Sequence, residues 1–564
     1  MLKTAINVLV AIAAINAIWA TTKATAKTED IRLVLQLTVD GLRGDLISRY
    51  GDRFGPGGFR YLLDNGVAFT NAHYGHANTE TIVGHATLAT GAHPSEHGMV
   101  GNVWYDRENG ELAYNIEDPN HPILPTRDDA VAGAQVDPAQ KQSRTSGRSP
   151  VSLLASTLGD ELWLHSAGKS KVFGVSGKDR SAVAMAGHVG KAFWFSTDTG
   201  DFQTSRYYYP AYPDWVSNWN ARRQAESLAG AEWSLNDEQS TYLFGASDDR
   251  PFEADLNGYG RVFPHPFGSP DDGLFFTKLL VSPEGDRLTA DFAKALIEAE
   301  GLGSDDVPDY LSVSFSGVDA VNHFFGPSSL ENEDVVLRLD ETLTDFLRFV
   351  DERVGLDRTL IVLSADHGMP EAPEVLASQG MNAGRIDPME IVDWANGVTR
   401  RKFDSEVSFV RSFFRPYLYL DSNAIAEAGL DQEAVEQAIA DEVLTHDGIA
   451  LAVSMKALPN LQNTATLERI RNNHHAIRSG DIYIVQKPYW FLQEGGTLAV
   501  MHGSPWRYDT YVPIIFAGAG MGSKTVNRPV RPVDVSPTLA AVLGIKPPSS
   551  TSGEPLVEVL PNLD

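Results

Sequence analysis

Five short runs of almost entirely apolar residues are the feature that most constrains how this 564-residue chain can fold. They occupy residues 32–39 (RLVLQLTV), 171–176 (KVFGVS), 310–316 (YLSVSFS), 359–364 (TLIVLS) and 512–517 (VPIIFA). A strand with one exposed face alternates apolar and polar residues, whereas a parallel strand covered on both faces does not. The runs therefore predict the strands of a mostly parallel sheet buried on both sides.

Stretches of helical character separate the runs. They are residues 84–90, 150–166, 291–300, 334–354 and 536–543. Strands that alternate with helices are typical of a doubly wound α/β sheet, which has helices on both of its faces. We therefore expect one large α/β catalytic domain over residues 27–564 rather than several small ones.

Three longer stretches interrupt this alternation. Residues 103–149 are polar, and residues 192–275 are rich in aromatic residues, Asp, Gly and Pro. Residues 405–500 hold the strand-like segments FRPYLYL and DIYIVQ around an expected helix at 431–444. We interpret all three as insertions that form a cap over one face of the sheet.

Residues 1–26 have the pattern of a secretory signal peptide, with Lys3, an apolar run over residues 5–20, and small residues at Ala20 and Ala26 as alternative cleavage points. The run is shorter than the ~20 apolar residues that a membrane-spanning helix needs. No later run has 18 consecutive apolar residues. We therefore expect an exported, periplasmic protein that is not in the membrane after cleavage.

The charge and the cysteine count exclude several kinds of protein. The chain has 46 Lys and Arg against 74 Asp and Glu, a formal net charge of −28, whereas nucleic-acid binding needs basic surfaces. It has no cysteine, which rules out disulfides, thiolate metal sites and cysteine nucleophiles. Any metal ion must therefore be held by His, Asp, Glu or other oxygen ligands.

Reactive side chains gather next to the predicted strands. They are Asp40 after the first strand, Lys178 and Arg180 after the second, Asp319 and His323 after the third, Asp366 and His367 after the fourth, and His502 before the fifth. In open α/β sheets ligands bind beyond the carboxyl ends of the strands. We therefore expect these residues to converge on one site.

Two metal sites are predicted among them. Asp319 and His323 are four residues apart, so they share one face of a helix and can chelate an ion, with His502 as a third ligand. The second predicted site comprises Asp40, Asp366 and His367. Such Asp/His sites with open positions suit catalytic zinc, although the ligands do not exclude manganese or iron.

The segment NTETIVGHATLATG suggests a nucleophile, because Thr81 precedes the start of a predicted helix, where anions are favoured. Thr79 is an alternative. A metal ion can activate a threonine hydroxyl by stabilising its alkoxide. Asn102 could donate a hydrogen bond to a phosphoryl oxygen. Lys178 and Arg180, two residues apart in an expected extended segment, could hold the remaining oxygens.

Together these motifs resemble the alkaline phosphatase superfamily, and within it the phosphate-irrepressible alkaline phosphatases of bacterial periplasms. The matching positions run in family order over nearly the whole chain: Asp40, Thr81 in T-x-x-G-H, Asn102, Lys178-x-Arg180, Asp319-x-x-x-His323, Asp366-His367 and His502. The resemblance implies two zinc ions per chain, the second also bound by Thr81. It also implies a phosphothreonine intermediate at Thr81, with Asn102, Lys178 and Arg180 binding phosphate.

The expected substrates are small phosphate monoesters, which a monomeric enzyme would hydrolyse. The alternative is a phosphodiesterase or nucleotide pyrophosphatase of the same superfamily, whose members share the metal ligands but lack the Lys-x-Arg pair. A sulfatase is disfavoured because Thr81 is not followed by that family's motif, and a non-catalytic phosphate- or metal-binding protein is a further alternative.

Other polar residues have simpler interpretations. We expect the histidines near Thr81 to be structural or to lie just behind the site: His73, His76, His85, His93 and His97. His474 and His475 are expected on the cap surface. The acidic residues between Glu331 and Asp345 are expected to form a solvated helix face.

Overall fold

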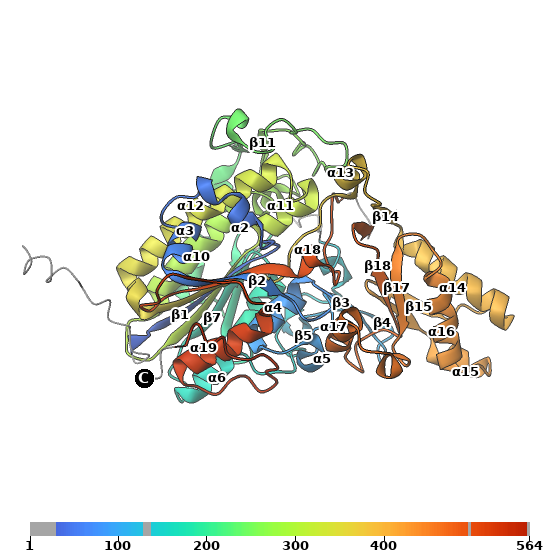
Figure 1. Ribbon diagram of the computed structural model, residues 1–564. Coiled ribbons are helices and arrows are strands. Elements are labelled where there is room, and N and C mark those ends of the chain that lie inside the picture. The colour runs from blue at the N-terminus through green and yellow to red at the C-terminus, as the bar shows by residue number, and fades with distance from the viewer. Residues whose placement is uncertain (1–29, 128–136, 494–497, 561–564) are drawn as a thin grey trace, which may run out of the picture.

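A nine-stranded central sheet is the core of the computed structural model, which describes residues 30–127, 137–493 and 498–560 (Figure 1). The predicted signal peptide lies outside the described residues. The strand order is β21-β2-β20-β13-β1-β12-β7-β8-β9. The five predicted runs form β1 (Leu33–Val39), β7 (Val172–Ser176), β12 (Asp309–Phe315), β13 (Thr359–Ser364) and β20 (Tyr511–Gly518).

The predicted, mostly parallel sheet is confirmed, with one correction. Strands β13, β1, β12, β7 and β8 (Lys191–Phe195) run parallel to one another. However, β20 pairs antiparallel with both β13 and β2 (Gly66–His73). An apolar run indicates burial on both faces but carries no information on direction. The sheet ends in β21 (Lys524–Val526) at one edge and β9 (Phe202–Gln203) at the other.

Helices cover both faces of this sheet (Figure 1). One layer contains α2 (Leu46–Arg49), α3 (Phe59–Asp64), α9 (Phe275–Leu280), α10 (Pro283–Glu300), α11 (Gly317–Phe325) and α12 (Leu330–Arg353). The opposite layer contains α4 (Thr81–Thr90), α5 (Pro94–His97), α6 (Leu158–His165), α7 (Asp179–Ala186) and α19 (Val535–Leu543). The expected helix at 150–166 forms only from Leu158, because Thr157 caps its first turn by accepting the amide of Asp160.

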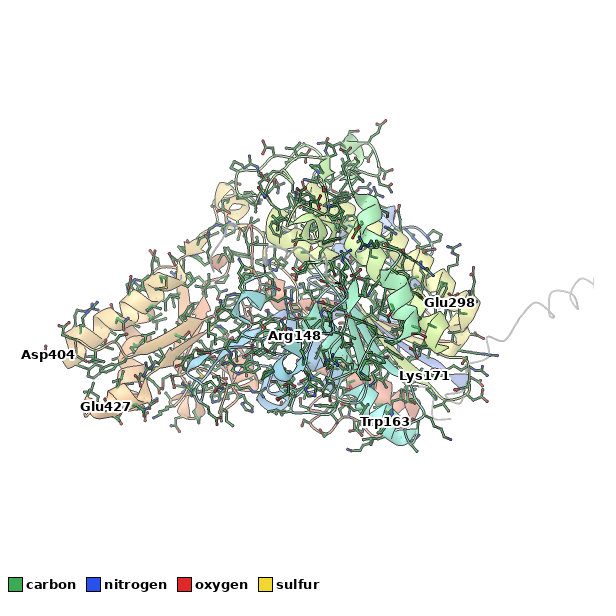
Figure 2. All side chains as sticks on the ribbon, turned by 180° about the vertical axis from the view of Figure 1, so that it is seen from behind. Arg148, Trp163, Lys171, Glu298, Asp404 and Glu427 are labelled. Atoms are coloured by element: carbon green, nitrogen blue, oxygen red, sulfur yellow. The ribbon has the colours of Figure 1, made fainter. Side chains whose placement is uncertain are left out.

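A second sheet of four strands lies beside the central one, in the order β15-β16-β18-β17. Its elements are β15 (Val410–Phe414), β16 (Tyr417–Leu420), β17 (Ile449–Ser454) and β18 (Ile482–Gln486), packed against α14 (Pro388–Phe403) and α16 (Gln432–Val443). We call this the cap sheet. Seen from behind, Asp404 and Glu427 mark its end of the molecule, opposite Lys171 and Glu298 (Figure 2).

Short elements complete the fold. They are β3 (Val103–Asp106), β4 (Glu111–Tyr114), β5 (Glu117–Pro122), β6 (Gly147–Arg148), β10 (Glu232–Trp233), β11 (His265–Pro266), β14 (Gly384–Ile386), β19 (Trp490–Leu492), α8 (Asp214–Asn220), α13 (Pro373–Ser378), α15 (Ser422–Glu427), α17 (Ala465–Asn473) and α18 (Arg507–Thr510). Strands β8 and β9, which overlap residues 192–275, belong to the central sheet. No helix in the described part of the chain is long and apolar enough to cross a membrane.

The register of the sheet aligns the ends of its central strands. Thr38 of β1 lies level with Ser364 of β13 and Ser314 of β12, and Ser314 is level with Ser176 of β7. All four strands point the same way, so the residues that follow them emerge at one edge. Six of the predicted site residues follow these strand ends within a few positions: Asp40, Lys178, Arg180, Asp319, Asp366 and His367. Thr81, Asn102, His323 and His502 come from other parts of the chain.

Candidate active site

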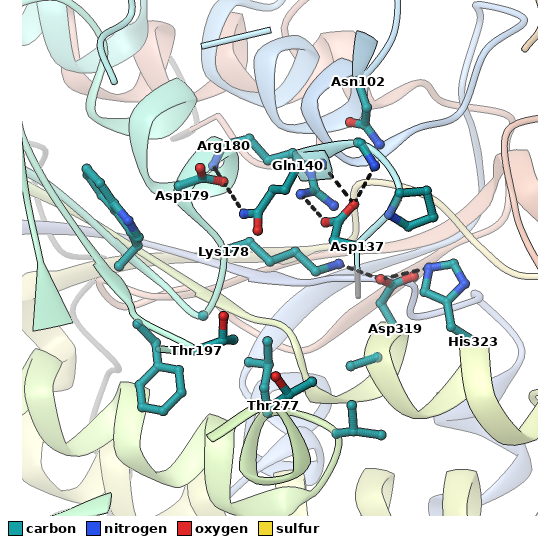
Figure 3. A pocket seen from close by; sticks show the side chains of 18 of the residues that line it. Asn102, Asp137, Gln140, Lys178, Asp179, Arg180, Thr197, Thr277, Asp319 and His323 are labelled. Atoms are coloured by element: carbon teal, nitrogen blue, oxygen red, sulfur yellow. Dashed lines mark hydrogen bonds and ion pairs between the residues drawn. The ribbon is translucent and has the colours of Figure 1, made fainter. Parts of the chain in front are cut away.

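Helix α11 brings two of the predicted metal ligands together. Asp319 and His323 lie one helical turn apart, with His323 Nε2 3.3 Å from Asp319 Oδ2 (Figure 3). His502, which precedes α18, places its Nε2 3.6 Å from Asp319 Oδ1. Asp319 and His502 are buried, and the three ligand atoms are close enough to hold one metal ion.

The second predicted group forms where β1 and β13 end. His367 Nε2 lies 3.2 Å from Asp40 Oδ1 and 3.4 Å from Asp366 Oδ2, and all three residues are buried. The ligand atoms that lie close enough together here for one ion are those of Asp40, His367 and Asp319, with Asp366 next to His367. Asp319 therefore lies between the two groups.

The donor atoms in these groups fit metal ions. Asp40 Oδ1, Asp319 Oδ1, Asp366 Oδ2 and His367 Nε2 are buried without a hydrogen-bond partner. Buried polar atoms are normally satisfied, because leaving one unpaired costs about 1–3 kcal/mol. Several unsatisfied ligand atoms that converge at one place are therefore the arrangement expected of divalent ion sites.

Lys178 supplies positive charge to the same carboxylates. Its Nζ donates to Asp40 Oδ2 at 2.8 Å and to Asp319 Oδ2. Burial opposes ionisation of Asp40, but Lys178 and His367 outweigh it and lower the pKa of this carboxyl. Burial also opposes protonation of His367, yet Asp366 and Asp40 raise its pKa to about 9. The site is therefore a strongly polarised cluster of opposite charges.

The motif T-x-x-G-H has a direct structural explanation. Thr81 is the first residue of α4 and is buried. A Cβ added to Gly84 would lie 2.0 Å from the carbonyl oxygen of Asp366, so only glycine lets α4 pack this close to the end of β13. His85 Nδ1 lies 2.8 Å from the Thr81 carbonyl and 3.2 Å from Asp366 Oδ2. His85 therefore lies directly behind the site, which is one of the two alternatives expected for the histidines near Thr81.

The structure favours Thr81 over Thr79 as the reactive hydroxyl. Thr79 Oγ1 donates to the Ser504 carbonyl at 3.0 Å, whereas Arg180 Nη2 donates to Thr81 Oγ1 at 3.4 Å. Asn102 accepts the Ile82 amide with its Oδ1 at 3.1 Å, which leaves its amide nitrogen as a donor. Asn102, Lys178 and Arg180 all line one cavity of about 290 Å³.

The expected extended conformation of the Lys178-x-Arg180 segment is wrong. Lys178 is extended, but Asp179 begins α7 and Arg180 is already helical. Asp179 anchors the start of α7, because its Oδ1 accepts hydrogen bonds from Tyr114 at 2.6 Å and from Gln140 at 2.9 Å. Both cationic side chains still reach the cavity, because α7 starts at its wall.

The sequence analysis missed two acidic residues, Asp137 and Asp179, that each pair with an arginine of the cavity wall. Both acids and Arg180 are labelled in Figure 3. Asp137 Oδ2 accepts from Arg180 Nη1 at 2.6 Å, and Asp179 Oδ2 accepts from Arg148 Nε at 2.7 Å. No spacing signal marks Asp137, which lies 43 residues from Arg180 in the sequence. One side of the cavity is apolar and includes Trp194, Phe195, Leu280 and Phe324.

The remaining histidines do not line this cavity. Behind α4, Thr87 Oγ1 lies 3.4 Å from His76 Nε2 and 3.2 Å from His97 Nε2, which fits the expected structural role. His93 is buried nearby, and His73 stacks on Tyr511. His474 and His475 lie in the loop after α17.

The expectation of a solvated acidic helix face is wrong for α12. Four of its acidic residues are at most 3% exposed: Glu331, Glu333, Asp334 and Asp340. Glu331 Oε1 lies 3.3 Å from His265 Nε2, and the pKa of nearby Glu253 is raised to about 9 by burial and by Glu331. We call Glu253, His265 and Glu331 the α12 cluster.

Comparison with known proteins places this site in a family. Residues 34–505 match the family described as type I phosphodiesterase / nucleotide pyrophosphatase. The chain belongs to this family. It is also 32% identical over 532 residues to alkaline phosphatase PhoV of Synechococcus elongatus. The matched residues cover 94% of this chain and 93% of that protein.

Two further relatives are similar over almost their full length. One, from Myroides odoratus, is named a calcium-transporting ATPase and is 32% identical, over 95% of this chain and 96% of its own. The other is alkaline phosphatase PafA of Elizabethkingia meningoseptica, 31% identical over 94% of each chain. A crystal structure of wild-type PafA has a TM-score of 0.85 at 30% identity, over 94% of this chain and 99% of that one. These likenesses confirm the predicted superfamily and its α/β fold.

Proposed function

We propose that this protein is a metal-dependent phosphatase that hydrolyses phosphate monoesters and releases inorganic phosphate. The observation that carries the proposal is the position of Thr81 Oγ1, which lies at the start of α4 and 3.4 Å from Arg180. The same helix packs against the proposed ligand Asp366 through Gly84 and His85. Alkaline phosphatases of about this length are among the similar proteins, which supports the same activity here.

Two zinc ions per chain are the proposed cofactors. Asp319, His323 and His502 would hold one ion, and Asp40, Asp366 and His367 with Thr81 would hold the other. Bound divalent ions would stabilise the Thr81 alkoxide and polarise the phosphoryl oxygens. The unsatisfied buried ligand atoms at both groups support this assignment.

The chain's own residues would then perform a two-step transfer. Thr81 Oγ1 attacks phosphorus, the P–O bond to the alcohol breaks, and a phosphothreonine forms. Water then hydrolyses the phosphothreonine and restores the hydroxyl. The N-terminus of α4 favours negative charge at this point. Asn102 donates a hydrogen bond to the phosphoryl group, and Lys178 and Arg180 supply positive charge to its other oxygens.

We further propose that the protein is exported to the periplasm by residues 1–26 and acts there as a monomer on small phosphate esters. The N-terminal charge and apolar pattern support export. The net charge of −28 supports small-molecule substrates over nucleic acids.

Hydrolysis of phosphodiesters is the second candidate function. The family description names phosphodiesterases, and the apolar side of the cavity could accept a second ester group. The deciding experiment measures kcat/KM of the purified, metal-assayed protein for an aryl phosphate monoester and its matched diester. We expect the monoester to be preferred, and a preference for the diester would overturn the proposal.

The nucleophile has its own test. Thr81→Ala should lower monoester turnover by about 10⁴-fold or more, because no other hydroxyl can form the covalent intermediate. Its metal content should remain that of the wild type. Thr79→Ala is the matched control and should retain most of the activity. Full activity of Thr81→Ala, or its loss in Thr79→Ala alone, would contradict the assignment.

A further inference from the structure

One fully buried carboxylate next to Thr81 is not explained by the proposed chemistry. Glu80 directly precedes α4 and has no exposed surface. Its Oε2 accepts the backbone amide of Asn102 at 2.6 Å and the side-chain amide of Asn78 at 3.2 Å. A buried charge is costly unless an opposite charge compensates it. The question is therefore which cation stabilises Glu80.

That cation comes from the cap sheet. Arg415 lies in the turn between β15 and β16, is 7% exposed, and places its Nη2 3.2 Å from Glu80 Oε1. Its Nη1 donates to the carbonyl oxygen of His502. The hairpin belongs to the cap sheet, whose β15 lies beside the central sheet in Figure 1. The contacts of Arg415 with Glu80 and His502 therefore link the cap sheet to the catalytic edge.

The surrounding backbone is shaped to admit this guanidinium. Gly503 has a φ of +118°, and a Cβ at this position would lie 2.6 Å from Arg415 Nη1. A Cβ on Gly101 would lie 3.0 Å from Glu80 Oε2. The two glycines therefore leave space on either side of the ion pair, and both Glu80 and Arg415 line the catalytic cavity.

The contacts form a path from the cap to the phosphate-binding asparagine. Arg415 pairs with Glu80, Glu80 holds the backbone of Asn102, and the Asn102 side chain is fixed through the Ile82 amide at 3.1 Å. Without Arg415, Glu80 Oε1 would lose its cationic partner and the carboxylate would turn toward water. That turn would weaken its bond to the Asn102 amide and displace the side chain.

We propose that Arg415 is a positioning residue of the active site, which neutralises Glu80 and thereby keeps Asn102 in place for the phosphoryl group. The cap sheet is then part of the phosphate-binding machinery rather than only a cover. The inference rests on the proposed function, because it assigns Asn102 to phosphate binding.

The first experiment compares a variant that lacks the positive charge of Arg415 with one that lacks the charges of both Arg415 and Glu80. Arg415→Met should lower kcat/KM for an aryl monoester by roughly 10–100-fold, the usual cost of losing a residue that orients a site. Adding Glu80→Gln removes the unpaired charge but keeps an acceptor for the Asn102 amide. The double variant should therefore regain most of the loss. If Glu80→Gln brings no recovery, the proposal is overturned.

The second experiment asks whether the effect passes through Asn102. In an Asn102→Ala background, Arg415→Met should cost less than about threefold, because the positioned side chain is already missing. An undiminished loss would overturn the proposal. So would a fall in metal content that accounts for the whole loss, since that would point to His502 instead.

Two controls keep the result interpretable. Arg411→Met alters an arginine of the same hairpin that pairs with Asp421 and is half exposed, so it should leave kcat/KM unchanged. Arg415→Lys keeps the charge, so it should be more active than Arg415→Met. Arg415→Ala replaces Arg415→Met if that variant does not fold, as judged by circular dichroism and Tm. A wild type that prefers diesters would refute the proposed function, yet the same ratios measured on the diester would still decide the role of Arg415.

Discussion

The molecule buries two groups of acidic residues, and they behave in opposite ways. At the strand ends, Asp40 and Asp319 have lowered pKa values, and the pKa of His367 is raised to about 9. In the α12 cluster the pKa of Glu253 is raised to about 9, and burial lowers that of His265 to about 4. Asp40 and Asp319 are therefore ionised, whereas Glu253 and His265 are neutral. Asp366, whose pKa is raised by burial and by Asp40, is the exception at the strand ends.

The difference follows from nearby cations. Burial opposes charge in both groups, but at the strand ends Lys178 donates to Asp40 and Asp319 and so compensates it. In the α12 cluster Arg250 lowers the pKa of Glu253 too weakly to overcome burial and Glu331. Burial of acids alone therefore does not identify a metal site. Ionised buried acids are a requirement of a metal site rather than proof of one, because Arg180 and Arg148 also keep Asp137 and Asp179 ionised.

The largest expected difference comes from removing one carboxylate from each group. Asp319→Asn should lose bound metal and lower monoester turnover by about 10³-fold or more, because Asp319 lies within reach of both ligand groups. Glu331→Gln should keep both metal and activity. Metal analysis and steady-state kinetics on the two variants test the comparison. Equal losses in both would show that the α12 cluster also serves the reaction.

A smaller effect is expected from removing the cations. The double variant Lys178→Ala with Arg180→Ala should lose roughly 10³-fold on a monoester but far less on a diester, which has one negative charge fewer. Arg250→Ala, which removes the cation near the α12 cluster, should leave both activities unchanged. Parallel losses on the two substrates would contradict a monoester-specific role for Lys178 and Arg180.

The smallest effect concerns pH and stability. In the folded protein the pKa of Glu253 is raised to about 9, whereas its ordinary pKa, which applies to the unfolded chain, is 4.5. Between these two values the folded state therefore binds one more proton than the unfolded state. Stability should therefore fall as pH rises through this window. Glu253→Gln should flatten the dependence, as measured by urea unfolding across the window. An equally steep curve in the variant would show that Glu253 is not its source.

The sequence predicted the catalytic edge well because each signal was local. Asp319 and His323 share a helix face at four-residue spacing, and Asp366-His367 follows directly on an apolar run. Their convergence followed from the rule that parallel strands end at one edge. The roles assigned to these residues remain predictions that the variants above can test.

What sequence reasoning missed depends on contacts between distant segments. Arg415 contacts Glu80 although the two are 335 positions apart in the sequence, and no spacing rule connects them. The antiparallel course of β20 was missed because hydrophobicity does not encode strand direction. The acids at the start of α12 were predicted to be solvated because acidic residues are usually exposed. The sequence does not show that residues 232–265 cover them instead of water.

The level ends of β13, β1, β12 and β7 have a consequence for engineering. Because a hydrogen-bonded ladder fixes the relative height of these strands, it also sets the spacing of the ligands that directly follow them, Asp40, Asp366 and His367. Cavity-lining residues to which no ligand or phosphate contact is assigned, such as Ser196, Thr197 and Asp198, are therefore the part to redesign for a new leaving group. A transplanted site, by contrast, would need all four strands moved as one unit.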